Sequence, residues 1–232
     1  MRNNCLSFIG LFFVLSTFVV SCDNSTDDDG GAGDFFNPNG YEYVELGLPS
    51  GIKWATCNIG ATKPEEYGGY YAWGETEEKS YYDWDTYKWC NGTYNSLTKY
   101  CTDSGSGRVD NKTVLDPEDD VAHIKWGGSW RMPTRDEIKE LNDNCTWQWT
   151  TLNGVNGYRV TGPNGNSIFL PAAGYCYGTE LSCRGTGGFY WLSSLGDGYR
   201  CSCAYGLGLY DGGHDWVNSG RYLGHCVRPV SK

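Results

Sequence analysis

Short apolar and aromatic runs, separated by glycine, proline and asparagine, recur along most of this chain. Runs of this length that are bounded by turn residues are typical of β-strands. We expect strands at residues 41–46, 53–57, 70–73, 157–161, 167–171, 188–194, 203–209 and 226–230. Pro163, Asn164 and Gly165 stand between two of these runs and predict the turn of an antiparallel hairpin.

Two short helices are predicted from their capping residues. Asp116 precedes a proline and several acidic residues, so it is the expected N-cap of a helix that ends near Lys125. Thr134 and Glu137 form a capping box, and the helix that follows is expected to end near Asn144. No parallel βαβ rhythm is present in the sequence. The pattern therefore predicts an α+β fold with two short helices, irregular antiparallel sheets and a long loop-rich half.

Residues 190–230 carry a different pattern, in which an apolar and aromatic skeleton is interrupted by residues of no consistent size or polarity. A core strand alternates by burial and a catalytic loop carries a few polar groups, but this segment does neither. It therefore suggests a variable binding face on a constant scaffold. The skeleton consists of Tyr190, Trp191, Ser193, Ser194, Ala204, Tyr205, Leu207, Leu209, Trp216, Arg221, Tyr222, Val227, Arg228, Pro229 and Val230.

The expected ligand-binding residues are those between the skeleton positions, and we call them the interspersed set. Its members are Cys176, Tyr177, Gly196, Gly198, Tyr199, Arg200, Cys201, Cys203, Gly206, Gly208, Tyr210, Gly212, Gly213, Asp215, Val217, Gly220, Leu223 and Cys226. Tyr199, Arg200, Tyr210, Asp215 and Leu223 are the best contact candidates, because large, polar or charged side chains give contact area and hydrogen bonds.

The first residues predict export. Arg2 precedes an apolar run too short to span a bilayer as a mature helix, and small residues lead into Cys22. This resembles a lipoprotein signal peptide at residues 1–21 with Cys22 as the lipidated N-terminus; the alternative is an ordinary signal peptide. Residues 22–40 are acidic and glycine-rich, so they are expected to form a flexible tether to one domain at residues 41–232.

Composition narrows the possible partners. The formal net charge of -10, with no basic stripe to offset it, disfavours binding to nucleic acid. No second apolar segment reaches membrane-spanning length, so a lipid anchor is the expected membrane attachment. Of the 11 cysteines, the nine after Cys22 are an odd number, which leaves at least one thiol free or paired with another chain. The sequence leaves their pairing open.

Candidate catalytic and metal-ligating groups are few. Glu118, Asp119 and Asp120 lie at the expected helix start, where capping explains carboxylates better than acid–base chemistry or Ca²⁺ binding. One residue separates Cys201 from Cys203, which is not the usual zinc spacing. The histidines show no nucleophile and base arrangement. The sequence therefore predicts no catalytic residue, metal or cofactor, and not an enzyme.

Several short motifs follow one another along the chain. They are ELGLPSG at residues 45–51, WATCN at 54–58, YAWGET at 71–76, WRMPT at 130–134, LPAAG at 170–174 and VRPV at 227–230. Together they resemble the Fibrobacter succinogenes major paralogous domain, which is common in Bacteroidetes lipoproteins. The resemblance implies a C-type-lectin-like fold. Lectins of that type usually carry a Trp-Asn-Asp triplet for Ca²⁺-dependent sugar binding, and Trp216-Val217-Asn218 departs from it.

Within that family, the tail resembles the variable protein of a diversity-generating retroelement, in which template adenines are copied with errors. Randomising the first two bases of an asparagine codon gives Gly, Tyr, Cys, Asp, Arg and Val among others, but not Lys, Glu, Gln, Met or Trp. Residues 184–230 contain no Lys, Glu, Gln or Met, and both tryptophans, Trp191 and Trp216, belong to the skeleton. A variable region is therefore expected at about residues 176–226, in which a cysteine needs no chemical purpose.

These features predict a surface-anchored recognition lipoprotein. Acidic residues after Cys22 resemble a surface-export tag of Bacteroidetes lipoproteins, which places the protein on the outer face of an outer membrane. Its expected partner is an unidentified protein or glycan on another cell, phage or host surface. The alternatives are an undiversified adhesin of the same domain family, a fibre-associated structural subunit and, less favoured, a secreted enzyme. The expected core tryptophans are Trp54, Trp73, Trp130, Trp191 and Trp216.

Overall fold

The computed structural model describes residues 35–36, 40–197 and 201–232. The expected signal peptide, the lipidation site Cys22 and most of the expected tether lie outside these residues. So do Gly198, Tyr199 and Arg200 of the interspersed set. The segment Gly33–Lys232 forms one compact unit.

Within the described residues, two short α-helices, two 3₁₀ turns and twelve short strands make up the fold. The helical elements are η1 (Trp84–Thr86), η2 (Pro117–Asp119), α1 (Val121–Trp126) and α2 (Arg135–Asn144). The strands are β1 (Phe35–Phe36), β2 (Glu42–Glu45), β3 (Lys53–Ala55), β4 (Thr146–Leu152), β5 (Val155–Thr161), β6 (Ser167–Pro171), β7 (Tyr175–Tyr177), β8 (Glu180–Ser182), β9 (Gly187–Leu195), β10 (Cys203–Tyr210), β11 (Gly213–Gly220) and β12 (Val230–Ser231).

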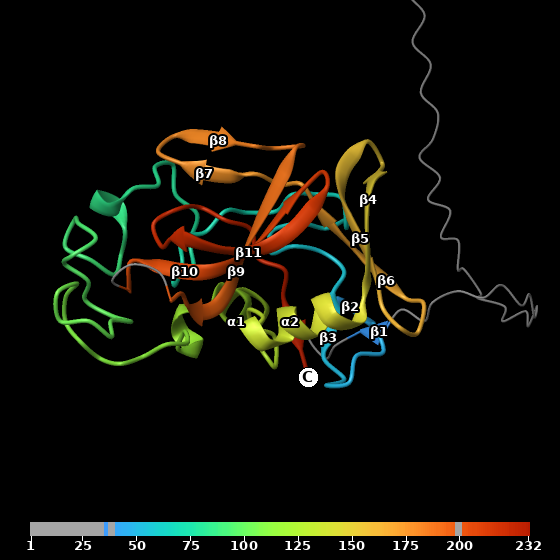
Figure 1. Ribbon diagram of the computed structural model, residues 1–232, viewed down its shortest axis with the longest axis horizontal. Coiled ribbons are helices and arrows are strands. Elements are labelled where there is room, and N and C mark those ends of the chain that lie inside the picture. Colours follow the sequence, from blue (N-terminus) through green and yellow to red (C-terminus); the bar gives the residue numbers. More distant parts are fainter. Residues whose placement is uncertain (1–34, 37–39, 198–200) are drawn as a thin grey trace, which may run out of the picture. The chain divides into compact units, whose positions relative to one another are not determined.

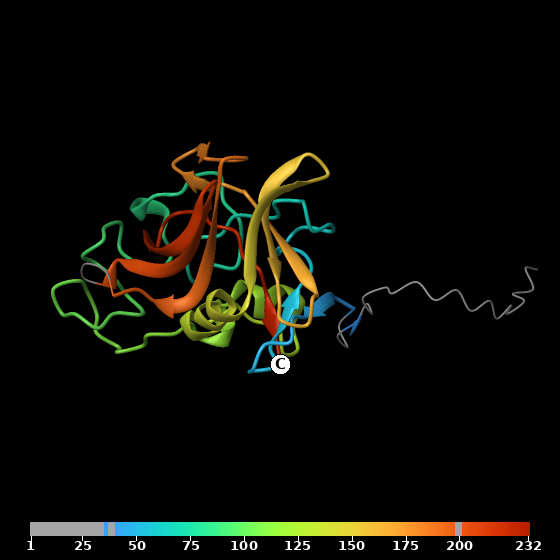
Figure 2. The ribbon, with the colours of Figure 1, turned by 45° about the vertical axis from the view of Figure 1, so that its right-hand side comes forward.

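The strands form four antiparallel sheets, in the orders β1-β2-β3-β12, β11-β10-β9, β4-β5-β6 and β7-β8. Figures 1 and 2 show α1 and α2 together at one end of the β9–β11 and β4–β6 sheets, with the β7–β8 hairpin at the other end. The prediction of antiparallel sheets with two short helices is confirmed. β1 lies within the expected tether, but its backbone pairs with β2, so regular structure starts before residue 41.

Two locally encoded predictions are confirmed. The β5–β6 hairpin pairs Tyr158 with Leu170, and its turn contains the predicted proline, asparagine and glycine. In α2 the Thr134 side chain accepts a hydrogen bond from the Glu137 backbone, and the Glu137 carboxylate accepts one from the Thr134 backbone at 2.8 Å. Burial alone raises the pKa of Glu137, but hydrogen bonds from Arg131 and Thr134 bring it below its usual range.

The start of the first helix differs from the prediction. Asp116 makes no capping hydrogen bond, and only a 3₁₀ turn follows it. Asp120 caps α1 instead, because its carboxylate accepts hydrogen bonds from the backbones of Ala122 and His123. The Asp116 carboxylate is held by the Lys99 ammonium. The predicted helix is therefore interrupted where Asp120 leaves the helical conformation.

Some strand predictions are wrong in extent. Residues 70–73 form no strand and contribute an isolated bridge from Tyr71 to His225, while of residues 226–230 only Val230 belongs to a strand, β12. The sequence pattern missed β1, β4, β7, β8 and β11. β11 has no buried position, and its half-buried and exposed positions do not alternate, so it lacks the pattern from which strands are recognised. β4 does alternate, since Trp147 and Trp149 are half-buried and Gln148 between them is exposed, so the sequence analysis overlooked a pattern that is present.

Four of the five expected core tryptophans are buried. Trp54, Trp73, Trp130 and Trp191 are at most 1% exposed. Two of them cross-link distant segments, since the Trp73 indole donates to the Leu192 carbonyl and the Trp191 indole to a carbonyl of the 70–73 segment, both at 2.7 Å. Trp216 is the exception, because it is only partly buried at the edge of the core.

Candidate binding face

The β9–β11 sheet carries most of the described interspersed set. Side chains alternate between the two sides of a strand, so the register assigns each position to a face. Leu207 pairs with Trp216, and Gly206 pairs with Val217 one position away. One side therefore carries skeleton residues and the other carries interspersed residues. We call these sides the inner face and the outer face.

The inner face packs against α2 and the β4–β6 sheet. Leu207 and Leu209 on this side are at most 1% exposed. The Arg135 guanidinium of α2 lies 4.4 Å from the Tyr205 ring centroid, and His214 stacks on Trp147 of β4 at 4.0 Å. Burial lowers the pKa of His214, so its imidazole stays neutral at pH 7. The inner face is thus a packed side of the core.

The outer face carries six interspersed positions. They are Gly206, Gly208, Tyr210, Gly213, Asp215 and Val217. The separation from the skeleton has exceptions, since the register places Cys203 and Gly220 on the inner side and the skeleton residues Ala204 and Trp191 on the outer side. Trp191 is 1% exposed because the His225 imidazole stacks on it, so the outer face is covered at this point.

Gly206 and Gly208 are buried because another member of the set covers them. A Cβ at Gly208 would lie 2.9 Å from the Val217 side chain, and one at Gly206 would lie 3.0 Å from both Val217 and the Tyr190 carbonyl. Gly206 and Gly208, which we expect to be ligand-binding residues, are therefore covered in this conformation. A larger residue at Gly208 has to displace a side chain, whereas one at Gly206 also meets backbone.

Aromatic residues that the sequence analysis did not select border the same face. Phe189 pairs with Gly208, and its ring lies 5.0 Å from that of Tyr175 and 5.5 Å from the His225 imidazole. Both Phe189 and Tyr175 are half-buried. Phe189 shares its face with the skeleton residue Trp191, because residues two apart on a strand lie on the same side, so the sequence pattern does not identify Phe189 as part of the binding face.

The β7–β8 hairpin and the chain after β11 continue this surface. Cys176 exchanges two backbone hydrogen bonds with Gly224, of 2.8 and 3.0 Å. The neighbouring Tyr177 is 52% exposed, and its ring lies 6.1 Å from Tyr222, edge to face. The early members of the interspersed set thus lie beside Leu223, although the sequence separates them widely.

Exposure divides the described members of the interspersed set into three groups. Exposed members are Tyr177, Tyr210, Gly212 and Asp215. Half-buried members are Cys176, Gly196, Cys203, Gly213, Val217, Gly220 and Leu223. Buried members are Cys201, Gly206, Gly208 and Cys226. Cys226 is 0% exposed and its thiol contacts the Tyr67 carbonyl at 3.2 Å, so this residue and Cys201 do not present ligand contacts in this conformation.

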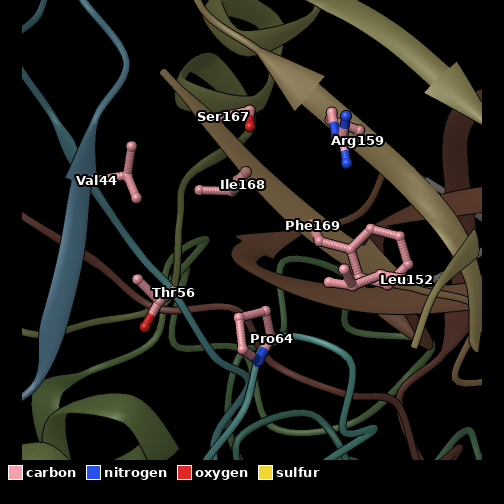
Figure 3. Close-up of a pocket in the computed structure, with 8 residues that line it drawn as sticks. All are labelled: Val44, Thr56, Pro64, Leu152, Arg159, Ser167, Ile168 and Phe169. Atoms are coloured by element: carbon pink, nitrogen blue, oxygen red, sulfur yellow. The ribbon is translucent and has the colours of Figure 1, made fainter. Parts of the chain in front are cut away.

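Two hollows lie away from this face. One, of about 160 Å³, is lined by Val44, Thr56, Pro64, Leu152, Arg159, Ser167, Ile168 and Phe169, which Figure 3 shows coming from β2, from the β4–β6 sheet and from the loops beside them. Another, of about 490 Å³, includes Asp120 and Trp130 in its lining. Neither is lined by an interspersed residue.

The carboxylates near α1 are engaged in structural contacts. Asp120 accepts backbone hydrogen bonds at the start of α1 and from Met132, and burial raises its pKa. Oxygens of Asp116, Glu118 and Asp119 lie within 4.8 Å of one another. The Lys99 ammonium lies 2.6 Å from oxygens of both aspartates, and Lys88 and Lys112 pair with one aspartate each, so ammonium groups of the chain itself offset the charge of this cluster.

Comparison with protein-family models, curated proteins and solved structures finds no match to this chain. Among the described residues, no helix is long and apolar enough to cross a membrane.

Proposed function

We propose that this chain is a surface-anchored recognition lipoprotein that binds its ligand through the outer face of the β9–β11 sheet. The proposal rests on the way the side chains of β10 and β11 are divided between the two faces of the sheet. Tyr205, Leu207 and Leu209 point into the core, while Tyr210 and Asp215 point away from it. Such an arrangement lets the exposed residues change without altering the packed ones, as a face of varying specificity requires.

The wider proposal has three further parts. The fold is C-type-lectin-like, Cys22 is lipidated with the domain on the outer side of an outer membrane, and a retroelement diversifies the interspersed set. The residue types missing from residues 184–230 support the last part. The ligand is a protein or glycan, because an exposed surface with tyrosines and a carboxylate offers contact area and hydrogen bonds to either.

Binding is tested by replacing exposed residues of the face. In a triple variant Tyr177→Ala, Tyr210→Ala and Asp215→Ala, we expect binding to fall at least about tenfold, since truncation of interface tyrosines commonly costs more than 1 kcal/mol. The measurement is a glycan and protein array, followed by titration of whichever probe binds the full wild-type chain.

The matched control is Tyr94→Ala. Tyr94 and Tyr210 are each 45% exposed, but Tyr94 lies in the loop after η1. The triple variant and the control should both melt within about 2 °C of the wild type, because surface substitutions seldom change stability by more than 0.5 kcal/mol. Equal binding by wild type, triple variant and control would contradict the assignment of this face.

Diversification is tested separately in the genome. A second copy of the DNA encoding residues 184–230, with adenines at the interspersed codons and a reverse transcriptase gene beside it, is expected. Their absence would remove diversification from the proposal and leave binding intact. Turnover of glycans or peptides by the full chain, lost in Asp120→Asn, would instead favour an enzyme.

A further inference from the structure

Two cysteines that are distant in sequence meet in the interior of the domain. Cys101 is 0% exposed and Cys201 is 5% exposed. The Cys201 sulfur lies 3.1 Å from both the backbone nitrogen and the side-chain oxygen of Thr102, the residue that follows Cys101. The Cys101 thiol also lies 3.1 Å from the Asp103 carbonyl oxygen. The two sulfurs are therefore close neighbours within packed surroundings.

A buried arginine holds the two backbones together at this point. One nitrogen of the Arg221 guanidinium donates to the Tyr100 carbonyl at 3.0 Å and to the Cys201 carbonyl at 3.1 Å. Arg221 is 0% exposed, and its other nitrogens donate to Tyr87 and Lys99. The guanidinium thus ties each cysteine-bearing segment to the same rigid group.

The local backbone is unusual on both sides of the contact. Tyr100 has a φ of 59° and Cys201 a φ of 57°, in the left-handed region that residues other than glycine seldom adopt. A conformation of this kind persists only where its surroundings fix it. The approach of Cys101 to Cys201 is therefore a defined feature of the fold.

We propose that Cys101 and Cys201 form a disulfide bond that joins the loop before α1 to the start of β10. All nine cysteines of the described residues are free thiols in the structure, so the bond requires an oxidant. That oxidant is a disulfide, carried by a small thiol such as glutathione or by a thiol oxidoreductase.

The reaction is two successive thiol–disulfide exchanges. One cysteine thiolate attacks the oxidant, which forms a mixed disulfide and releases the first oxidant thiol. The second cysteine thiolate then attacks the mixed disulfide, which forms the Cys101–Cys201 bond and releases the second. Two electrons and two protons pass from the cysteines to the oxidant, which is reduced to two thiols.

This inference goes beyond the proposed function, because it depends on the contact of two thiols and not on any ligand. It does bear on the binding face. Cys201 precedes β10, and a cross-link there anchors the strand that carries Gly206 and Gly208. A disulfide that closes a loop of about 100 residues also lowers the conformational entropy of the unfolded chain. The folded state is therefore more stable relative to the unfolded one.

The test is a disulfide map of the full chain. The protein is unfolded in urea with reductant, refolded in a buffer of reduced and oxidised glutathione, alkylated and digested with trypsin without reduction. We expect the peptide of residues 100–108 to be joined to that of residues 201–221. The joined peptide should disappear in Cys101→Ser and Cys201→Ser.

Cys203→Ser is the matched control, because Cys203 lies in the same tryptic peptide as Cys201. That variant should keep the joined peptide. If a variant does not fold, fragmentation of the joined wild-type peptide decides the question, because it locates the bond at Cys201 or at Cys203. Alkylation of both Cys101 and Cys201 in the refolded wild type, or a bond from either of them to a different cysteine, would overturn the proposal.

Thermal stability gives a second measurement. The oxidised wild type should melt about 10 °C above the same protein in reductant, given the loop length and the size of the domain. The double variant Cys101→Ser and Cys201→Ser should melt at one temperature in both buffers. A wild-type melting temperature that reductant does not change would count against the bond.

Discussion

Single residues in this protein have roles that their types alone do not reveal. Arg228 belongs to the skeleton, and its side chain is 2% exposed and donates to Asn58 and to the carbonyls of Ala55 and Phe169. Burial lowers its pKa. Arg221 is held in the same way. Each of these arginines donates to several backbone carbonyls and to one side-chain oxygen, and these hydrogen bonds offset the cost of burying two cations in a small core.

The glycines of β9 and β10 differ in what surrounds them, and this gives a prediction. Gly208→Ser should lower the free energy of unfolding by less than about 1 kcal/mol, because the Val217 side chain can rotate away. Gly188→Ala should cost about 1–3 kcal/mol, because its Cβ would lie 2.8 Å from the Pro171 carbonyl, which is backbone. Urea unfolding of both variants measures the difference.

An equal loss of stability in the two variants would contradict this reading of β10. It would mean that Gly208 is fixed by packing, as Gly188 is, and that the outer face does not accept replacement there. Gly188 is the appropriate comparison because it lies in the same sheet and outside the interspersed set.

A helix matches its predicted bounds most closely when neighbouring residues mark where it begins. α2 begins at the predicted capping box, ends at Asn144 as expected and buries Ile138 and Leu141. α1 lacks such a signal, because several carboxylates precede it and any of them can serve as its cap. Which one does so depends on Lys99, a residue of another loop that holds Asp116 and Asp119.

The capping box of α2 gives a prediction for that element. Thr134→Ala should lower the free energy of unfolding by about 1 kcal/mol, because the Glu137 backbone N–H then lacks its acceptor. Thr134→Ser keeps the hydroxyl and should remain within about 0.5 kcal/mol of the wild type. Chemical denaturation measures both, and a Ser variant as unstable as the Ala variant would show that the methyl group of Thr134 matters more than its hydroxyl.

At the scale of the whole molecule, the segments 70–73 and 221–227 are held between the sheets, where they contact residues from many parts of the chain. His225 illustrates this position. It pairs with Tyr71 through the backbone and stacks on Trp191 at 3.9 Å, and its Nδ1 atom has no hydrogen-bond partner among the described residues. Burial lowers the pKa of this imidazole from 6.5 to about 3.

This buried histidine predicts a pH dependence of global stability. The unfolded chain takes up a proton at His225 below about pH 6.5, while the folded protein does so only near pH 3. The free energy of unfolding should therefore fall as pH decreases between these values, by up to about 1.4 kcal/mol per pH unit from this group. His225→Phe should have a shallower slope over the same range in urea titrations at several pH values.

His225→Phe also changes the packing around residue 225, but that change shifts the free energy of unfolding equally at every pH. Comparing the slopes of this free energy against pH therefore isolates the effect of protonation. Identical slopes in wild type and His225→Phe would show that His225 is protonated in the folded state at ordinary acidity. The carboxylates contribute their own slope, but they do so in both proteins and cancel in the difference.

The sequence by itself determined the features that neighbouring residues decide. These are the hairpin turn at residues 163–165, the capping box of α2 and the strands β5, β6, β9 and β10. Each rests on backbone preferences or side-chain spacing over a few residues, so the pattern contains the necessary information.

Only the tertiary structure decided which residues distant in sequence pack against, cover or pair with one another. It placed Val217 over two glycines, put Cys201 against Cys101 and Cys226 inside the core, and gave the cap of α1 to Asp120. It also paired β11 with β10, although the positions of β11 show no alternation of burial. Burial and pairing of this kind depend on contacts across the chain, and no local pattern records which partner a side chain will meet.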